Sequence, residues 1–439
     1  MSLYILKSNQ QLKKIVSNTG WIFAERGLRI GLTLLVSGLM ARYLGTEQFG
    51  QLNYALAFVA LFSVISSLGL DSLLVRDVVQ SPSSKDELLG TVFNLKVIGS
   101  LAAILLSFLT IRLLQPEEDL LHWLVLISAV GLVFRAFDVI DLFFQSQVAS
   151  KFGVIAKSIS FALSSLIKLG LIFFSASLLA FAWAGITEFA IYAICLVILY
   201  QSNHLQVLRW HWNPKRAFQL LSQSWPLMLS GMSVLIYMKI DQVMLGAMVG
   251  SEALGIYSAI VPLSEVWYFI PVAIVISATP YIIKARETSE SLYYQRLQQL
   301  FSLLTALSFF VAIPMTFLSE PLIVLIYGQS YKAGGVMLAI HIWACIFVSL
   351  GVSQGIWDVN EGLTGLRLQR TLIAAILNIG LNLALIPLYA GSGAATSTVI
   401  SYAASGYILN IMNKKTRRIF FLQTNSFLFF RGCFRWVKV

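Results

Sequence analysis

Seven basic residues lie inside long apolar stretches of this sequence, and five of them are candidate substrate-binding residues: Arg26, Arg29, Lys96, Lys168 and Lys239. At the lipid-facing centre of a membrane helix an ionised side chain costs about 2.5–3.5 kcal/mol. These side chains are therefore expected to face a hydrated interior or a carboxylate on another helix. Lys96 and Lys168 have no acidic partner at helical spacing, so each either pairs across helices or remains available to an anionic substrate. For the other three, anion binding and pairing across helices both remain open.

Acidic residues occur in the same stretches, and three are candidates for binding a coupling ion: Glu25, Asp241 and Glu265. Glu25 lies four residues before Arg29, so these two side chains share one face of a helix. Lys239 and Asp241 are two residues apart, so they face different sides and do not neutralise each other. One further group repeats every three residues, and a local salt-bridge ladder is the favoured interpretation for it: Arg135, Asp138 and Asp141.

The composition indicates a membrane protein. Of 439 residues, 58% are hydrophobic and only 12% are charged, against about 25% charged in a typical soluble domain. The net charge of +11 does not indicate nucleic-acid binding, because the basic residues lie at the ends of apolar runs rather than on a polar domain. Cysteines and histidines lack metal-ligand spacing, and no nucleotide-binding loop or Ser/His/Asp arrangement is present. We therefore predict no enzyme, no metal site and no bound cofactor.

Twelve apolar segments reach the length of about 20 residues that a bilayer-spanning helix needs. They cover 17–41, 48–70, 88–113, 119–144, 152–175, 178–201, 222–249, 254–282, 297–320, 333–357, 367–389 and 392–412. The prediction is an all-α integral membrane protein made of two six-helix bundles. Its predicted parts are an N-terminal bundle (1–202), a basic cytoplasmic linker (203–221), a C-terminal bundle (222–413) and a basic, aromatic cytoplasmic tail (414–439).

The distribution of Lys and Arg predicts the orientation. With both termini cytoplasmic, only three basic residues fall in outer loops: Arg42, Arg112 and Lys332. Short cytoplasmic loops of membrane proteins carry the excess of basic residues, so we predict that both termini are inside. For the tail from Lys414, an interfacial segment on the anionic inner leaflet is expected, with a disordered tail as the alternative.

The two halves carry a similar sequence between their first and second helices. Residues 44–50 read LGTEQFG and residues 249–255 read VGSEALG. A hydroxyl residue followed by Glu suits a helix start, and the glycines permit a tight turn. A duplicated six-helix unit with a substrate site between the halves is one explanation, and independent choice of similar turn chemistry is the other.

The whole chain resembles, in length, topology and repeat, the polysaccharide exporters of the multidrug/oligosaccharidyl-lipid/polysaccharide (MOP) superfamily, specifically the Wzx-type O-antigen flippases. The local matches are residues 41–50, 239–246 and 325–331. This resemblance implies a V-shaped pair of bundles, like those of multidrug extruders and lipid II flippases, around a cationic cavity. It also implies a flippase that moves undecaprenyl-pyrophosphate-linked oligosaccharide units to the outer leaflet of the bacterial inner membrane, for O-antigen (lipopolysaccharide), capsule or exopolysaccharide assembly.

The resemblance assigns the pyrophosphate to the basic residues, since arginine binds phosphate in a bidentate manner and lysine binds it as a point charge. Arg26 and Arg29 match the region where related lipid II flippases carry cavity arginines, although the two additional helices typical of those proteins are missing here. Alternating access is the expected mechanism, with H⁺ or Na⁺ as the coupling ion. The implied partners are the lipid-linked substrate, the bilayer, and the polysaccharide polymerase and chain-length proteins.

Three other functions remain as alternatives. A cation-coupled multidrug extruder of the same fold would bind organic cations through Glu25, Asp241 and Glu265. A scaffold protein without transport does not explain the charges kept inside the membrane. An intramembrane glycosyl-transferring enzyme usually needs a large outer loop, and the outer loops predicted here are short.

Overall fold

The computed structural model describes residues 2–428, except for the side chains of residues 2–26 and of Leu28. Every regular element in this range is a helix. Ten helical stretches of the described chain are long and apolar enough to cross a membrane: Arg29–Gln80, Pro82–Leu114, Asp119–Ser146, Lys151–Phe173, Leu178–Ser202, Pro214–Met248, Ser251–Thr288, Glu290–Tyr327, Gly334–Asn360 and Thr364–Ile411. The predicted all-helical, multi-pass membrane protein is thereby confirmed.

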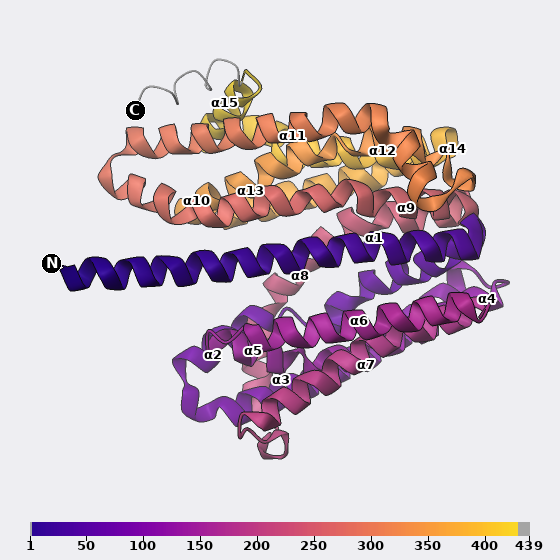
Figure 1. Cartoon of the computed structure of the whole chain (residues 1–439), viewed down its shortest axis with the longest axis horizontal. Helices are drawn as coiled ribbons and strands as arrows, with labels where there is room; N and C mark the ends of the chain where they lie inside the picture. Colours follow the sequence, from indigo (N-terminus) through magenta and orange to yellow (C-terminus); the bar gives the residue numbers. More distant parts are fainter. Residues whose placement is uncertain (1, 429–439) are drawn as a thin grey trace.

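The helices form two groups, which we call the N-half (2–202) and the C-half (214–428). The N-half contains α1 (Ser2–Ser67), α2 (Asp71–Gln80), α3 (Lys85–Leu114), α4 (Asp119–Phe134), α5 (Asp138–Ser146), α6 (Lys151–Phe173) and α7 (Leu178–Ser202). The C-half contains α8 (Pro214–Met248), α9 (Ser251–Glu265), α10 (Phe269–Thr288), α11 (Glu290–Tyr327), α12 (Gly334–His341), α13 (Ala344–Asn360), α14 (Thr364–Gly406) and α15 (Arg417–Ser426). In Figure 1 the bulk of each half forms its own bundle, and α1 runs between the two.

Two of the ten stretches are interrupted at boundaries that the sequence predicts. Helix α1 is broken at Gly45, whose φ of 72° is readily adopted only by glycine. Helix α14 is broken at Ala390, with a φ of 49°. Gly45 lies between the predicted segments 17–41 and 48–70, and Ala390 lies between 367–389 and 392–412. Twelve crossings and cytoplasmic termini nevertheless stay predictions, because the structure contains no membrane.

The linker is shorter than predicted because α8 begins at Pro214 rather than near residue 222. Asn213 caps this helix, since its side-chain oxygen accepts the backbone N–H groups of Lys215 (3.0 Å) and Arg216 (3.2 Å). An Asn followed by Pro at the first helical position is a strong helix start. The Arg216 guanidinium is 2.8 Å from the carboxylate of Asp77 on α2. This ion pair attaches the start of the C-half to the N-half.

The described part of the tail, up to residue 428, contains a short helix that packs on the C-half. On α15, Arg418 forms an ion pair of 2.6 Å with Glu290 of α11, and the hydroxyls of Ser426 and Thr305 are 2.9 Å apart. The alternative of a disordered tail is therefore wrong for residues 417–426. The rest of the tail prediction, for residues 429–439, lies outside the described residues.

The two halves are joined at the end of the molecule where Gly45 and Gly250 make their turns, which is the predicted outer side. Arg42 of α1 donates to the backbone carbonyl oxygen of Ile326 in the C-half (3.0 Å). The hydroxyl of Tyr331 donates to the carbonyl oxygen of Ala41 (3.0 Å). Helices α1 and α9 are in extensive contact here. At the opposite end, on the left of Figure 1, the two bundles are farther apart.

Candidate substrate cavity

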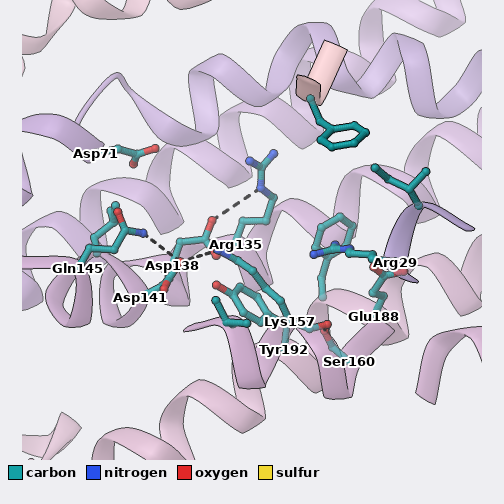
Figure 2. Close-up of a pocket in the computed structure, with 15 residues that line it drawn as sticks. Arg29, Asp71, Arg135, Asp138, Asp141, Gln145, Lys157, Ser160, Glu188 and Tyr192 are labelled. Carbon is teal, nitrogen blue, oxygen red and sulfur yellow. Dashed lines mark hydrogen bonds and ion pairs between the residues drawn. The ribbon is translucent and has the colours of Figure 1, made fainter. Parts of the chain in front are cut away.

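A cavity of about 760 Å³ lies in the N-half, and one C-half residue, Phe269 of α10, closes its wall. The helices α1, α2, α5, α6 and α7 surround it. The labelled side chains in Figure 2 converge on this space from several helices. Its charged lining residues are Arg29, Asp71, Arg135, Asp138, Asp141, Lys157 and Glu188. We call this space the N-half cavity.

A break in one membrane helix places two of the charged residues beside the cavity. The predicted segment 119–144 consists of α4, a 3₁₀ turn at Arg135–Phe137 and α5. A 3₁₀ stretch in the middle of a helix changes the direction in which side chains project. Arg135 opens this turn and Asp138 follows it, and the Arg135 Nε lies 3.9 Å from the Asp138 carboxylate. At that distance Arg135 is only loosely paired, and its side chain remains 41% exposed.

Of the predicted ladder of Arg135, Asp138 and Asp141, only the pair Arg135–Asp138 forms. Asp141 is paired instead with Lys157 of α6, whose Nζ lies 2.8 Å from the carboxylate. The same carboxylate accepts a hydrogen bond of 3.2 Å from the side chain of Gln145. A contact of 2.8 Å is typical of a charge-assisted hydrogen bond, and the cation that makes it lies on another helix.

Arg29 is a cation in this cavity without a carboxylate partner among the described side chains. Its guanidinium lies over the ring of Phe161, 5.4 Å from the centroid, which is a cation–π arrangement. An arginine held by an aromatic ring keeps its hydrogen-bond donors free for an anion. The predicted neighbours Glu25 and Arg26 belong to the same helix, but their side chains lie outside the described set.

Lys96 and Lys168 are paired across helices, one of the two outcomes that the sequence leaves open. Lys96 is buried, and its Nζ lies 2.6 Å from Asp71, whose side chain is 56% exposed. Lys168 lies 3.3 Å from Glu188. Asp71 and Glu188 line the N-half cavity, whereas the two lysines do not. Each lysine therefore pairs with a carboxylate that lines the cavity, without lining the cavity itself. Direct contact of either lysine with a substrate stays a prediction.

The three remaining predicted residues lie in the C-half, away from the lining of the N-half cavity. Asp241 of α8 is buried and accepts hydrogen bonds from the hydroxyls of Tyr257 (2.5 Å) and Thr398 (3.2 Å) and from the backbone N–H of Gln242 (2.7 Å). Lys239 has no carboxylate within ion-pair distance in the described chain. The structure thus does not bring Lys239 to the same cavity as Arg29.

Sequence reasoning missed a second polar cavity, of about 500 Å³, within the C-half. Its lining includes Arg367 and Arg370 at the start of α14. The sequence places Arg367 at the outset of a predicted helix, where a basic residue is expected for topology alone. The sequence feature that could have indicated this cavity is the pair Arg367 and Arg370, which are three residues apart and share a helix face.

The fold is similar to that of several solved membrane transporters. One similar structure is an inward-facing multidrug resistance MATE family transporter of the MOP superfamily. The alignment covers 90% of this chain and 96% of the transporter, with a TM-score of 0.69 and 14% identity. The alignment with the lipid II flippase MurJ in an inward closed conformation covers 92% of this chain and 90% of MurJ, with a TM-score of 0.72 and 15% identity. The MATE multidrug transporter DinF-BH has a TM-score of 0.59, 17% identity and coverages of 91% and 95%. At these identities the likeness concerns the fold, which is that of MOP-superfamily membrane transporters.

The chain belongs to the polysaccharide biosynthesis protein family, whose profile matches residues 15–286. A sequence comparison with curated proteins gives no match. The predicted resemblance to the polysaccharide exporters of the MOP superfamily is confirmed by family and fold together.

Proposed function

We propose that this protein is a flippase for polyprenyl-diphosphate-linked oligosaccharides, in bacteria the undecaprenyl-linked repeat units of O-antigen, capsule or exopolysaccharide. The observation that carries this proposal is Arg29, a cation that faces a cavity of about 760 Å³ and has no carboxylate partner among the described side chains. Membership in the polysaccharide biosynthesis family supports a polysaccharide precursor as the cargo. A diphosphate concentrates negative charge, and arginine binds it through paired hydrogen bonds.

The proposed mechanism is alternating access in the bacterial inner membrane. The diphosphate is drawn to Arg29 and Arg135, the sugars occupy the polar interior, and the polyprenyl chain stays in lipid. The contacts of Arg42 and Tyr331 close the predicted outer side in this conformation. Separation of these contacts and closure at the other end would present the head group to the outer leaflet. A coupling ion, H⁺ or Na⁺, bound at Asp241 would bias that transition.

The test is to delete the gene and to analyse surface polymer and lipid intermediates. Loss of surface polysaccharide with accumulation of lipid-linked repeat units in the cytoplasmic leaflet is the expected result. Normal surface polymer and an unchanged lipid pool would overturn the flippase proposal. Polymerase and chain-length proteins are then expected among the partners, and crosslinking in the native membrane measures this.

One observation favours a second candidate, a cation-coupled multidrug extruder. Four carboxylates line the N-half cavity, and Asp138 is paired only loosely. Carboxylates with aromatic neighbours such as Tyr192 can hold an organic cation. Hypersensitivity of the deletion strain to cationic dyes, together with normal surface polymer, would establish this alternative.

A further inference from the structure

The second cavity, which we call the C-half cavity, is enclosed by α8, α13 and α14. It shares no lining residue with the N-half cavity. Its polar lining includes Ser230, Gln354, Asp358, Arg367, Arg370 and Thr371, together with the tyrosines described next. A substrate made of a diphosphate and several sugars needs more space than the diphosphate alone, and this cavity lies in the half to which the proposed mechanism has assigned no part of the substrate.

An aromatic pair forms one wall of the C-half cavity. The rings of Tyr237 and Tyr402 have centroids 5.0 Å apart and an interplanar angle of 73°. Tyr402 is buried, with an exposed fraction of 5%, whereas Tyr237 is partly exposed. Edge-to-face packing of this kind fixes the orientation of the exposed ring. A fixed aromatic face beside hydroxyl and amide groups suits a pyranose ring, whose C–H bonds pack on the aromatic face while its hydroxyls are hydrogen-bonded.

The two arginines of the C-half cavity differ in what holds them. Arg370 is buried and neutralised, because its guanidinium lies 2.6 Å from Asp358 and donates to the side chain of Asn410 at 2.7 Å. Arg367 is exposed to the cavity and has no carboxylate within ion-pair distance in the described chain. Its guanidinium therefore offers a full positive charge and free donors to a ligand. The natural partner of such a group is an anion.

The charge distribution separates two subsites. The N-half cavity has seven charged lining residues, among them the two arginines assigned to the diphosphate. The C-half cavity has three, of which Arg370 and Asp358 neutralise each other, so one charge remains among hydroxyl, amide and aromatic groups. Such a lining fits a sugar with an acidic substituent better than it fits a diphosphate or an alkyl chain.

Resting on the proposed function, we infer that the C-half cavity is the subsite for the oligosaccharide, with Tyr237 as the stacking face and Arg367 as the donor to an acidic sugar substituent. The inference names a substrate class, a lipid-linked oligosaccharide that carries a carboxylate or phosphate group on a sugar. It also assigns one part of the substrate to each half: the N-half binds the diphosphate, and the C-half binds the glycan.

The test uses the full-length protein in proteoliposomes and four polyprenyl diphosphate probes. The first carries no sugar, the second a neutral disaccharide, and the third the same disaccharide with one hexuronic acid; a fourth probe with a phosphorylated sugar distinguishes the two anionic substituents. Flipping is measured for wild type, Arg367→Gln, Tyr237→Leu, Tyr237→Phe and a control, Arg296→Gln. Arg296 is exposed on α11, and its guanidinium donates a hydrogen bond to the side chain of Gln299 (3.0 Å) on the same helix.

Arg367→Gln should slow flipping of an acidic probe about tenfold and leave the neutral and sugar-free probes unchanged, since one charge-assisted hydrogen bond is lost. Tyr237→Leu should slow every sugar-bearing probe and not the bare diphosphate, and Tyr237→Phe should restore the rate because it keeps the aromatic face. Folding of each variant is checked by size-exclusion chromatography and thermal unfolding.

Two results would overturn the subsite. If Arg367→Gln slows the sugar-free probe as much as the acidic one, Arg367 belongs to the diphosphate site. If Arg367→Gln and Tyr237→Leu both behave like Arg296→Gln with every probe, the cavity does not contact the glycan. A wild-type protein that flips none of the probes would instead refute the proposed function itself, and the two failures are therefore distinguishable.

Discussion

Gly50 of α1 and Gly255 of α9 face each other where the two halves of the protein cross. A side chain on Gly50 would collide with the backbone carbonyl of Ser251, and a side chain on Gly255 would collide with that of Thr46. The two glycines end the repeated sequences 44–50 and 249–255, so the repeat packs against itself. Two copies of one motif meeting about a common axis would place the two glycines in this way, so the contact favours the duplicated unit, which stays a prediction. The contact joins the halves at the predicted outer side.

Gly50→Val should prevent closure of the outer side. The added side chain meets rigid backbone rather than a flexible side chain, so α1 and α9 must separate. We expect transport to be lost and a cysteine placed at Ala41, in an otherwise cysteine-free protein, to become reactive toward a membrane-impermeant thiol reagent added outside. Gly380→Val is the matched control, because a β-carbon on Gly380 of α14 meets nothing within 4 Å. Unchanged transport in Gly50→Val would show that these helices need not touch during the cycle.

Arg29→Ala should abolish surface polysaccharide at an unchanged protein level. The loss of one or two charge-assisted hydrogen bonds to a diphosphate, at about 1.5–3 kcal/mol each, predicts a fall of at least tenfold in flipping rate. Arg29→Lys should retain part of the activity, since lysine keeps the charge and loses the bidentate geometry. Surface-polymer immunoblots with a parallel blot for the protein measure both quantities. The control is Arg112→Ala, an arginine whose described side-chain contact is the ring of Phe108. Normal polymer in Arg29→Ala would remove Arg29 from the mechanism.

The sequence predicts the helices and the repeat better than the site, and the reason is physical. Apolar length and turn glycines are local properties, so the breaks at Gly45 and Gly250 are visible in the sequence. Pairing of charges across helices is not local. Asp141 follows Arg135 and Asp138 in a repeat of three residues, yet its cation is Lys157, sixteen residues away on α6. Local spacing therefore predicts a self-neutralised ladder where the structure has a cavity wall.

Two further cations show the same limit. Topology alone accounts for Arg367 in the sequence, because a basic residue at a helix end has an ordinary explanation in a membrane protein. Its position in a second cavity follows from how α14 packs against α8 and α13. Lys239 is grouped with Arg29 by the sequence because both lie in mid-segment, whereas in the fold only Arg29 lines the N-half cavity. Depth in a segment is readable from the sequence, and the direction of a side chain is not.

Asp241→Asn should uncouple transport from an ion gradient. The carboxylate is buried, and its ring of donors, Tyr257, Thr398 and the backbone of Gln242, includes no cation within ion-pair distance in the described structure. A buried carboxylate without a cation is a suitable place for a proton or Na⁺ to bind. In proteoliposomes, wild-type flipping should accelerate under an imposed pH or Na⁺ gradient, and Asp241→Asn should flip at one slow rate regardless of either. The control is Glu320→Gln, whose carboxylate is more than half exposed and paired with Lys332. A variant that still responds to the gradient would place the coupling ion elsewhere, with Glu265 the next residue to substitute.

Arg370→Leu should act on stability, in contrast to its neighbour Arg367. Asp358 and Arg370 are 2% and 9% exposed and lie 2.6 Å apart, and removal of one member of a buried ion pair typically costs about 3–5 kcal/mol. We expect a clear drop in the unfolding temperature in detergent for Arg370→Leu and a partial recovery in Asp358→Leu/Arg370→Leu, which removes both charges. Arg367→Gln should unfold at the wild-type temperature and lose only the flipping of acidic probes. If Arg370→Leu were as stable as wild type and Arg367→Gln were not, the roles of the two arginines would be exchanged: Arg370 would be the ligand-binding cation, and Arg367 would hold the wall of the cavity.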